Sequence, residues 1–175
     1  VDRLLRLIAQ PDWLAEAARI TLSSKGANTP GIDGEIKLTV QARLPAILKQ
    51  IRSDLLSGVY SPLPARRVYI PKANGKQRPL GIPTLRDRIV QRAMLMAMEP
   101  VWESDFHALS YGFRPERSVH HAIRTVKLQL TDNNETRGRW VIEGDLSSYF
   151  DTVHHRLLMK AVRRRIRDRR FLNLL

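Results

Sequence analysis

One segment of this 175-residue chain has the pattern of a β-hairpin, and the segments around it carry apolar residues at helical spacing. Residues 66–71 (RRVYIP) predict a strand, residues 73–76 (ANGK) a tight turn and residues 77–82 (QRPLGI) the returning strand. Helices are expected over residues 4–20, with a new start at Pro11, and over 40–56, 85–102, 118–130 and 154–166. A helix-rich chain with one hairpin belongs to the α+β or mixed α/β class.

The positive charge of the chain is concentrated in two stretches. Lys and Arg number 30 against 17 Asp and Glu, which gives a net charge of +13. Residues 66–92 and residues 156–170 each hold eight basic residues and one acidic residue, so the rest of the chain has a net charge of −1. Concentrated like charge opposes folding, and the two stretches therefore indicate a polyanionic partner, first of all nucleic acid. They argue against an enzyme of small neutral metabolites.

Composition excludes several other classes of protein. The chain has no cysteine, which rules out a disulfide framework, a thiolate zinc site and a cysteine nucleophile, and which fits a reducing compartment. It has no apolar run long enough to cross a membrane and no signal peptide. With 43% hydrophobic residues at regular spacing, it can build a core and is not expected to be disordered.

A carboxylate follows a short apolar run near residue 140. Residues 140–145 (WVIEGD) predict a buried strand that ends at Asp145. A carboxylate held there suits Mg²⁺, which prefers oxygen ligands and keeps waters for substrate phosphates. Phe150 would then stand beside a metal-bound substrate. The alternative is that Asp145 caps the next helix and Phe150 belongs to the core.

Two further segments have the residue types of an anion site. Lys72 and Arg78 flank the hairpin turn and can converge on a triphosphate or a nucleic-acid backbone, although an ordinary solvated hairpin has the same pattern. Residues 111–120 (YGFRPERSVH) interleave aromatic residues with arginines, as in proteins that stack on bases and contact phosphates; the alternative is that the aromatic residues are packed. The arginine run 163–170 is dense enough to favour phosphate contact over a solvated helix face.

Four of these segments, taken in order, resemble the N-terminal part of group II intron-encoded reverse transcriptases/maturases. They are residues 26–34 (GANTPGIDG), 70–91 (IPKANGKQRPLGIPTLRDRIVQ), 110–123 (SYGFRPERSVHHAI) and 144–155 (GDLSSYFDTVHH). The resemblance implies a right-hand polymerase fold. Residues 1–24 would be an N-terminal helical extension, residues 25–139 the fingers with the N-terminal loop and the basic hairpin, and residues 140–175 the beginning of the palm.

The resemblance also implies roles for single residues. Asp145 would be the first of three metal-binding aspartates and a catalytic residue, with the main-chain carbonyl of Leu146 near the same metal, in a site for two Mg²⁺ ions. Lys72 and Arg78 would hold the incoming deoxynucleoside triphosphate, and the ring of Phe150 would exclude a ribose 2′-hydroxyl.

The expected contacts to template and primer come from four places in the chain. They are the loop residues Gly26, Asn28, Gly31 and Gly34, the hairpin residues Arg66, Arg67 and Lys76, the pair Arg114 and Arg117, and the later pair Arg163 and Arg164.

The function implied is RNA-directed DNA polymerase of a mobile group II intron, with an RNA template or intron RNA and a DNA primer as partners and with assistance to splicing. A cytoplasmic location is expected; a dimer is compatible with the sequence. These polymerases take two more carboxylates from an Asp-Asp pair, and these 175 residues contain none. We therefore interpret the chain, which stops in an apolar run at residues 171–175, as a fragment that binds nucleic acid without polymerising. The alternatives are a non-catalytic RNA-binding scaffold or maturase and a retron or CRISPR-associated reverse transcriptase.

Overall fold

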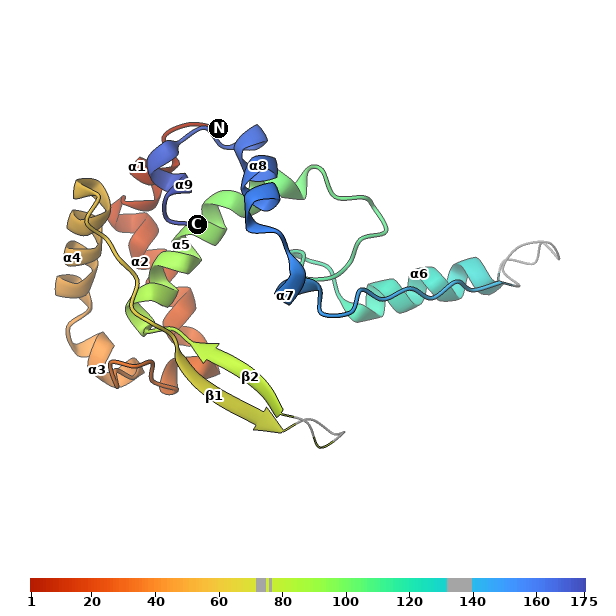
Figure 1. Ribbon diagram of the computed structural model, residues 1–175, viewed down its shortest axis with the longest axis horizontal. Helices are drawn as coiled ribbons and strands as arrows, with labels where there is room; N and C mark the ends of the chain where they lie inside the picture. The colour runs from red at the N-terminus through yellow and green to blue at the C-terminus, as the bar shows by residue number, and fades with distance from the viewer. Residues whose placement is uncertain (72–74, 76, 132–139) are drawn as a thin grey trace. The chain divides into compact units, whose positions relative to one another are not determined.

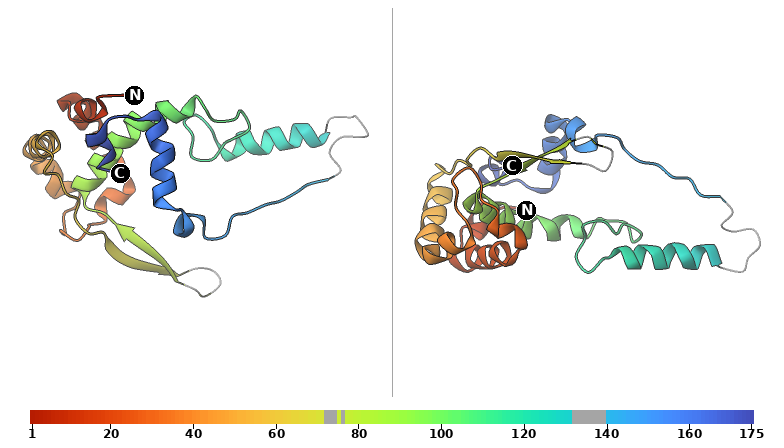
Figure 2. Two further views of the ribbon diagram at one scale, coloured as in Figure 1. Left: turned by 45° about the horizontal axis from the view of Figure 1, so that its top comes forward. Right: turned by 90° about the horizontal axis from the view of Figure 1, so that it is seen from below.

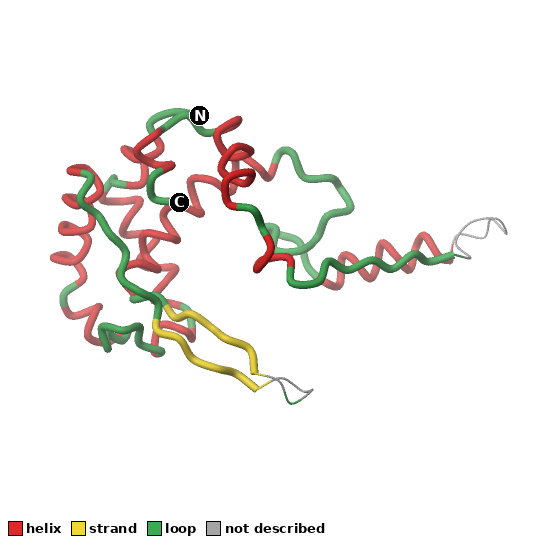
Figure 3. The backbone as a smooth tube through the Cα atoms, in the orientation of Figure 1, coloured by secondary structure: helices red, strands yellow, loops and turns green. Residues whose placement is uncertain are grey.

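The computed structural model describes residues 1–71, 75, 77–131 and 140–175. The regular secondary structure of these residues is helical except for one two-stranded antiparallel sheet, and loops connect the elements; this confirms the α+β class (Figure 3). In chain order the elements are α1 (Leu4–Ile8), α2 (Pro11–Ser23), the 3₁₀ helix η1 (Lys25–Asn28), α3 (Lys37–Ala42), α4 (Leu44–Ser57), β1 (Arg66–Pro71), β2 (Gln77–Ile82), α5 (Leu85–Glu103), α6 (Val119–Thr131), α7 (Tyr149–Thr152), α8 (His155–Arg165) and α9 (Arg169–Leu172). None of the helices in this part of the chain is both long and apolar enough to span a membrane.

The chain divides into two compact units. The first consists of residues 1–100 and 163–175, and the second of residues 101–162. Helices α1, α2, α4 and α9 pack together in the first unit, and the hairpin projects from the helices of this unit (Figures 1 and 2). Its core consists of fully buried apolar side chains from these helices and from α5: Ile8, Leu14, Ile51, Leu55, Leu85, Ile89 and Phe171.

The two ends of the chain meet in the first unit. The backbone N–H of Arg167 donates to the carbonyl of Val1 at 3.0 Å. The N–H of Leu5 donates to Oδ2 of Asp168 at 2.9 Å, while Oδ1 of the same carboxylate caps the start of α9. These bonds join α9 to the N-terminal segment, although more than 160 residues separate them in the sequence.

Most of the predicted helices are present, and their ends follow the expected local rules. Pro11 begins α2, and Gly58 ends α4 in the left-handed conformation with φ 79°. The helix expected over residues 40–56 is instead two helices, α3 and α4, that meet at Arg43. Pro45 explains the break, because proline has no N–H to donate to the carbonyl four residues earlier and fits the first turn of a helix.

The expectation of a buried strand at residues 140–145 is wrong for this structure. The segment is neither helix nor strand, and Trp140, Val141 and Ile142 are exposed. A strand needs a partner for its backbone N–H and C=O groups, and none of the described residues pairs with this segment. An apolar run in the sequence carries no information about a pairing partner.

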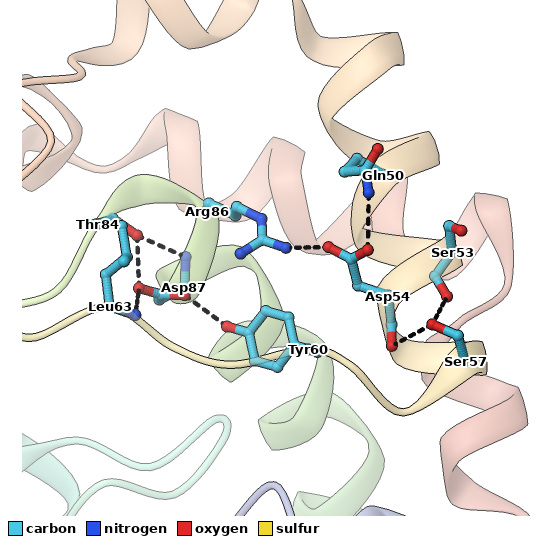
Figure 4. A network of polar contacts seen from close by, with 9 residues as sticks. All are labelled: Gln50, Ser53, Asp54, Ser57, Tyr60, Leu63, Thr84, Arg86 and Asp87. Atoms are coloured by element: carbon cyan, nitrogen blue, oxygen red, sulfur yellow. Dashed lines mark hydrogen bonds and ion pairs between the residues drawn. The ribbon is translucent and has the colours of Figure 1, made fainter.

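A buried carboxylate holds the base of the hairpin. Asp87 on α5 is 1% exposed and accepts hydrogen bonds from the Tyr60 hydroxyl at 2.6 Å, the Leu63 N–H at 3.1 Å and the Thr84 hydroxyl at 2.7 Å (Figure 4). Leu63 precedes β1 and Thr84 follows β2, so one side chain ties both ends of the hairpin to α5. Burial, and then the bond to Asp87, raise the pKa of Tyr60 well above its usual value.

A salt bridge connects the same region to α4. Arg86 lies 2.5 Å from Oδ2 of Asp54, and its guanidinium also stacks over the ring of Tyr60 at 5.0 Å (Figure 4). Gln50 donates to the other oxygen of Asp54 at 2.8 Å. Because an isolated two-stranded sheet is only marginally stable in water, these contacts at its base are needed to give the hairpin a defined direction.

Tyr60→Phe should destabilise the first unit. The change leaves the buried Asp87 carboxylate one partner short, and we expect the free energy of unfolding to fall by about 1–3 kcal/mol in urea titrations followed by circular dichroism. Tyr69→Phe is the matched control, because Tyr69 is 58% exposed on the hairpin, and we expect a change within about 0.5 kcal/mol. Equal unfolding midpoints for the two variants would contradict the importance assigned to Asp87.

Candidate nucleic-acid interface

The hairpin separates its arginines between two faces. Arg66 pairs with Ile82, and Ile70 pairs with Arg78, which places Arg66 and Arg78 on the same face of the two-stranded sheet. Arg67 lies on the opposite face and is exposed. Lys72 and Lys76 lie outside the described residues, so the expected convergence of Lys72 and Arg78 stays a prediction.

The N-terminal loop, residues 25–36, is fastened to the hairpin and to α5 by two arginines. Arg88 on α5 donates to the carbonyls of Pro83 at 2.9 Å, Gly26 at 2.8 Å and Thr29 at 2.6 Å. Arg66 on β1 donates through Nε to the carbonyl of Pro30 at 3.0 Å. Loop and hairpin are therefore parts of one hydrogen-bonded assembly.

Close packing adds to these bonds. Gly31 is buried, and a Cβ atom at this position would lie 2.7 Å from the Cα of Thr84. Ala27 has no exposed surface and packs with Leu22, Val40 and Leu85. Only glycine at position 31 therefore lets the loop lie this close to the start of α5 without a shift of either backbone segment.

The other three loop residues expected to contact nucleic acid have different surroundings. Gly26 and Asn28 are exposed, although the carbonyl of Gly26 is used by Arg88. Gly34 has a φ of 72° and its Cβ position is open, so glycine is favoured there by backbone conformation and not by crowding. In the sequence Arg88 is only one of the basic residues of 66–92, because nothing local distinguishes a guanidinium that binds carbonyls from one that binds phosphates.

In the second unit, Arg114 organises the loop before α6. Its side chain is 6% exposed, and it donates to both carboxylate oxygens of Glu103, with a shortest distance of 2.7 Å. It also donates to the carbonyls of His107 and Ser110, each at 2.9 Å. The hydrogen bonds from Arg114 lower the pKa of Glu103. The guanidinium thus uses its N–H groups to join the loop to the end of α5.

The neighbouring residues are more accessible. Arg117 donates to the carbonyl of Ala108 at 2.8 Å and lies 5.4 Å from the centre of the Tyr111 ring. The Tyr111 hydroxyl is 2.7 Å from that of Thr125 on α6, so Tyr111 is anchored. Phe113 is fully exposed and has a φ of 56°, in the left-handed region. Of the two aromatic residues, Tyr111 is therefore held in the loop and Phe113 is not packed.

The segment around Asp145 offers oxygen ligands to solvent. Asp145 is exposed, as are Leu146 and Phe150, and the Phe150 ring meets Tyr149 edge-on at 5.5 Å between centroids. Ser148, at φ 51°, precedes the short helix α7. Among the described residues, no three His, Asp or Glu side chains gather as a metal site would require. The Asp145 carboxylate and the Leu146 carbonyl fit Mg²⁺ by donor type, and they could supply only part of a two-metal site.

The last basic stretch contains arginines in two different situations. Arg163 and Arg164 at the end of α8 are exposed. Arg170 on α9 donates to the carbonyl of Leu55 at 3.3 Å and also to that of Leu56, near the end of α4. Arg170 therefore satisfies carbonyls of a helix terminus, as basic residues commonly do there.

A comparison with known families decides which class of protein this is. The sequence profile described as reverse transcriptase (RNA-dependent DNA polymerase) matches residues 70–172, which include the hairpin from Ile70 onward, the Arg114 loop and Asp145. The chain belongs to the reverse transcriptase family. Three of the four segments by which this reverse transcriptase chain resembles the family, residues 70–91, 110–123 and 144–155, lie inside the matched region.

Individual relatives agree with this assignment. The reverse transcriptase chain is 82% identical over all of its 175 residues to the protein YkfC of Escherichia coli, and it covers 46% of that protein. It is 38% identical over 167 residues to the group II intron-encoded protein LtrA of Lactococcus lactis, covering 95% of the chain and 26% of LtrA. It is 34% identical over 93 residues, 53% of the chain, to nuclear intron maturase 1 of Arabidopsis thaliana, of which it covers 12%. The resemblance to group II intron-encoded reverse transcriptases and maturases is confirmed, and the chain spans less than half of each of these relatives.

Gly31→Ala should loosen the attachment of the loop. The added methyl group would meet the backbone of Thr84 at 2.7 Å, and such overpacking costs about 1–3 kcal/mol. We expect a lower urea midpoint and faster hydrogen exchange of the amides of residues 26–34. Gly112→Ala is the control, because a Cβ at Gly112 meets nothing within 4 Å. If both variants exchange at the wild-type rate, the close approach of the loop to α5 does not hold it in place.

Proposed function

We propose that the protein is an RNA-directed DNA polymerase of a mobile group II intron, in which residues 1–24 are a helical extension, residues 25–139 the fingers and residues 140–175 the beginning of the palm. The observation that carries the proposal is the match of the reverse transcriptase profile to residues 70–172. The relationship to an intron-encoded protein and to an intron maturase supports an RNA template or intron RNA as partner and assistance to splicing as a second role. A cytoplasmic location belongs to the same proposal.

The proposed chemistry is addition of a deoxynucleotide to a DNA primer. The Asp145 carboxylate and the Leu146 carbonyl would hold Mg²⁺, which in such sites activates the attacking hydroxyl and stabilises the departing pyrophosphate. Lys72 and Arg78, which flank the predicted turn in the sequence, would bind the triphosphate, Arg78 with the two-pronged geometry that suits phosphate. The exposed ring of Phe150 would pack against the sugar and leave no space for a 2′-hydroxyl.

Template and primer would lie against the loop and the hairpin of the first unit. Arg88 and Arg66 hold the loop in one shape, and a preorganised loop binds without a further ordering cost. The proposed contacts of this loop are made by Gly26, Asn28, Gly31 and Gly34. Arg67 and Lys76 would contact phosphates directly, and Arg163 and Arg164 would do so from α8. We propose that Arg117 touches the template and that Arg114 supports it by holding the loop.

Primer extension tests the proposal. These 175 residues contain no Asp-Asp pair, and two Mg²⁺ ions held by one carboxylate would be poorly positioned. We expect the chain to bind an RNA–DNA template–primer without extending it. The complete gene product should extend the primer if it adds such a pair, and Asp145→Asn should then reduce the rate by at least about a hundredfold, which corresponds to about 2.7 kcal/mol in the barrier.

Two results would change this conclusion. Extension by the 175-residue chain alone would show that Asp145 suffices or that other carboxylates serve. A gene product that has the pair but does not extend any primer would favour the second candidate, a non-catalytic RNA-binding scaffold. The observation that favours the scaffold is that the exposed Asp145 carboxylate belongs to no metal-type cluster in the part of the chain described.

The two faces of the hairpin should have different substrates. In an extending gene product, Arg78→Ala should raise the KM for deoxynucleoside triphosphates about tenfold or more, because a hydrogen bond to a charged group contributes about 1.5–3 kcal/mol. The Kd for the template–primer should change by less than about threefold, or 0.7 kcal/mol. Arg67→Ala, on the opposite face, should show the reverse pattern. Equal effects of Arg78→Ala on the KM and on the Kd would indicate that Arg78 contacts the template–primer as well as the nucleotide.

A further inference from the structure

A surface pocket surrounded by three arginines lies where α8 ends and α9 begins. Arg163, Arg167 and Arg169 line it, together with the side chains of Ile166, Leu172 and Asn173, and its volume is about 470 Å³. All six residues belong to the first unit. Ile166 and Leu172 are buried, so they form an apolar floor beneath a basic rim.

No residue that the structure describes neutralises the three guanidinium groups. Arg163, Arg167 and Arg169 are exposed, and their side chains form no hydrogen bond or ion pair with any residue that the structure describes. The acidic residue nearest in sequence, Asp168, directs its carboxylate to the backbone N–H groups of Leu5, Arg170 and Phe171. The pocket therefore holds concentrated positive charge, and an anion bound there would relieve the repulsion.

The backbone that carries these arginines is fixed in place. Ile166 and Phe171 have no exposed surface, and the N–H of Arg167 is bonded to the carbonyl of Val1 at 3.0 Å. Arg170, in the same run, is used to bind carbonyls at the end of α4 and does not line the pocket. Burial and hydrogen bonds thus hold the segment while three of its arginines stay free for a ligand.

We infer that this pocket binds the phosphates of a nucleic-acid backbone, an assignment that rests on the proposed nucleic-acid-binding function and extends it to Arg167 and Arg169. Arginine suits phosphate because its planar group donates two parallel hydrogen bonds, and three such groups on one rim can serve successive phosphates of a strand. None of the described residues that line the pocket is aromatic, so a free nucleotide would find no surface there for its base to stack on.

The salt dependence of binding tests the inference. The 175-residue chain is titrated into a fluorescent RNA–DNA template–primer at several salt concentrations, as wild type and as the triple variant R163Q/R167Q/R169Q. Each phosphate contact contributes about 0.7–0.9 to the slope of log K against log salt, so the triple variant should lower the magnitude of the slope by about 2. Its affinity near 0.1 M salt should fall about tenfold or more.

Two further triple variants separate this site from general charge effects. R6Q/K49Q/R52Q removes the same charge from exposed positions of the first unit that do not line this pocket, and its slope should stay within about 0.5 of wild type. R163K/R167K/R169K keeps the charge, so it should retain the slope and lose several-fold in affinity, because lysine cannot form the two-pronged contact. Circular dichroism melts should be alike for all four proteins, since every changed side chain is exposed.

The possible failures are distinct. If the wild-type chain binds with a steep salt slope and the two glutamine variants lose the same amount, the pocket is not a binding site, while the proposed function stands. If the pocket variant loses binding of deoxynucleoside triphosphates and not of template–primer, its occupant is a free nucleotide and the inference is wrong. If the wild-type chain does not bind nucleic acid at all, both the pocket and the nucleic-acid-binding function are refuted.

Discussion

The buried carboxylate of Asp87 is the interaction on which the described part of the interface depends. It accepts hydrogen bonds from the segment before β1 and from the residue that follows β2, and it lies on the first turn of α5. A carboxylate in this position would be costly to bury without partners, and three donors compensate it. The next residue, Arg88, extends the same attachment to the N-terminal loop. A short stretch of α5 thus sets the positions of the hairpin and of the loop, which together carry most of the proposed contacts of the first unit.

The arginines of this chain serve two purposes that their sequence context does not separate. Arg66, Arg88, Arg114 and Arg170 bind backbone carbonyls or a carboxylate and so stabilise loops and helix ends. Arg67, Arg163, Arg167 and Arg169 are exposed and available to an anion. The same donor geometry suits both uses, since a guanidinium group binds a carbonyl and a phosphate oxygen with the same N–H groups. The net charge of +13 therefore overstates the charge available for nucleic acid.

Membership of the reverse transcriptase family gives these local features a common purpose. The matched region begins at Ile70 in the hairpin and ends at Leu172 in α9, and it includes residues of both compact units. In our proposal the first unit contributes the nucleotide-binding hairpin, while the second contributes Asp145 and Phe150. Asp145 remains accessible to solvent, as a ligand for a metal that also binds substrate phosphates has to be.

The residue order alone was sufficient to predict the hairpin and most helix positions, because turns, prolines and helical periodicity act within a few residues. It was also sufficient to recognise the family, because the four motifs can be read directly from the sequence. It was also sufficient to single out Gly31, but not to show why glycine is needed there, since the clash with Thr84 comes from a residue 53 positions away. The pairing of residues 140–145 could not be read from their apolar character, because a strand exists only with a partner. The roles of Asp87, Arg88 and Asp168 appear only in the folded chain, where hydrogen bonds join segments distant in sequence. Local patterns specify which elements form, and long-range contacts decide which charged side chains stabilise the fold and which remain free to bind.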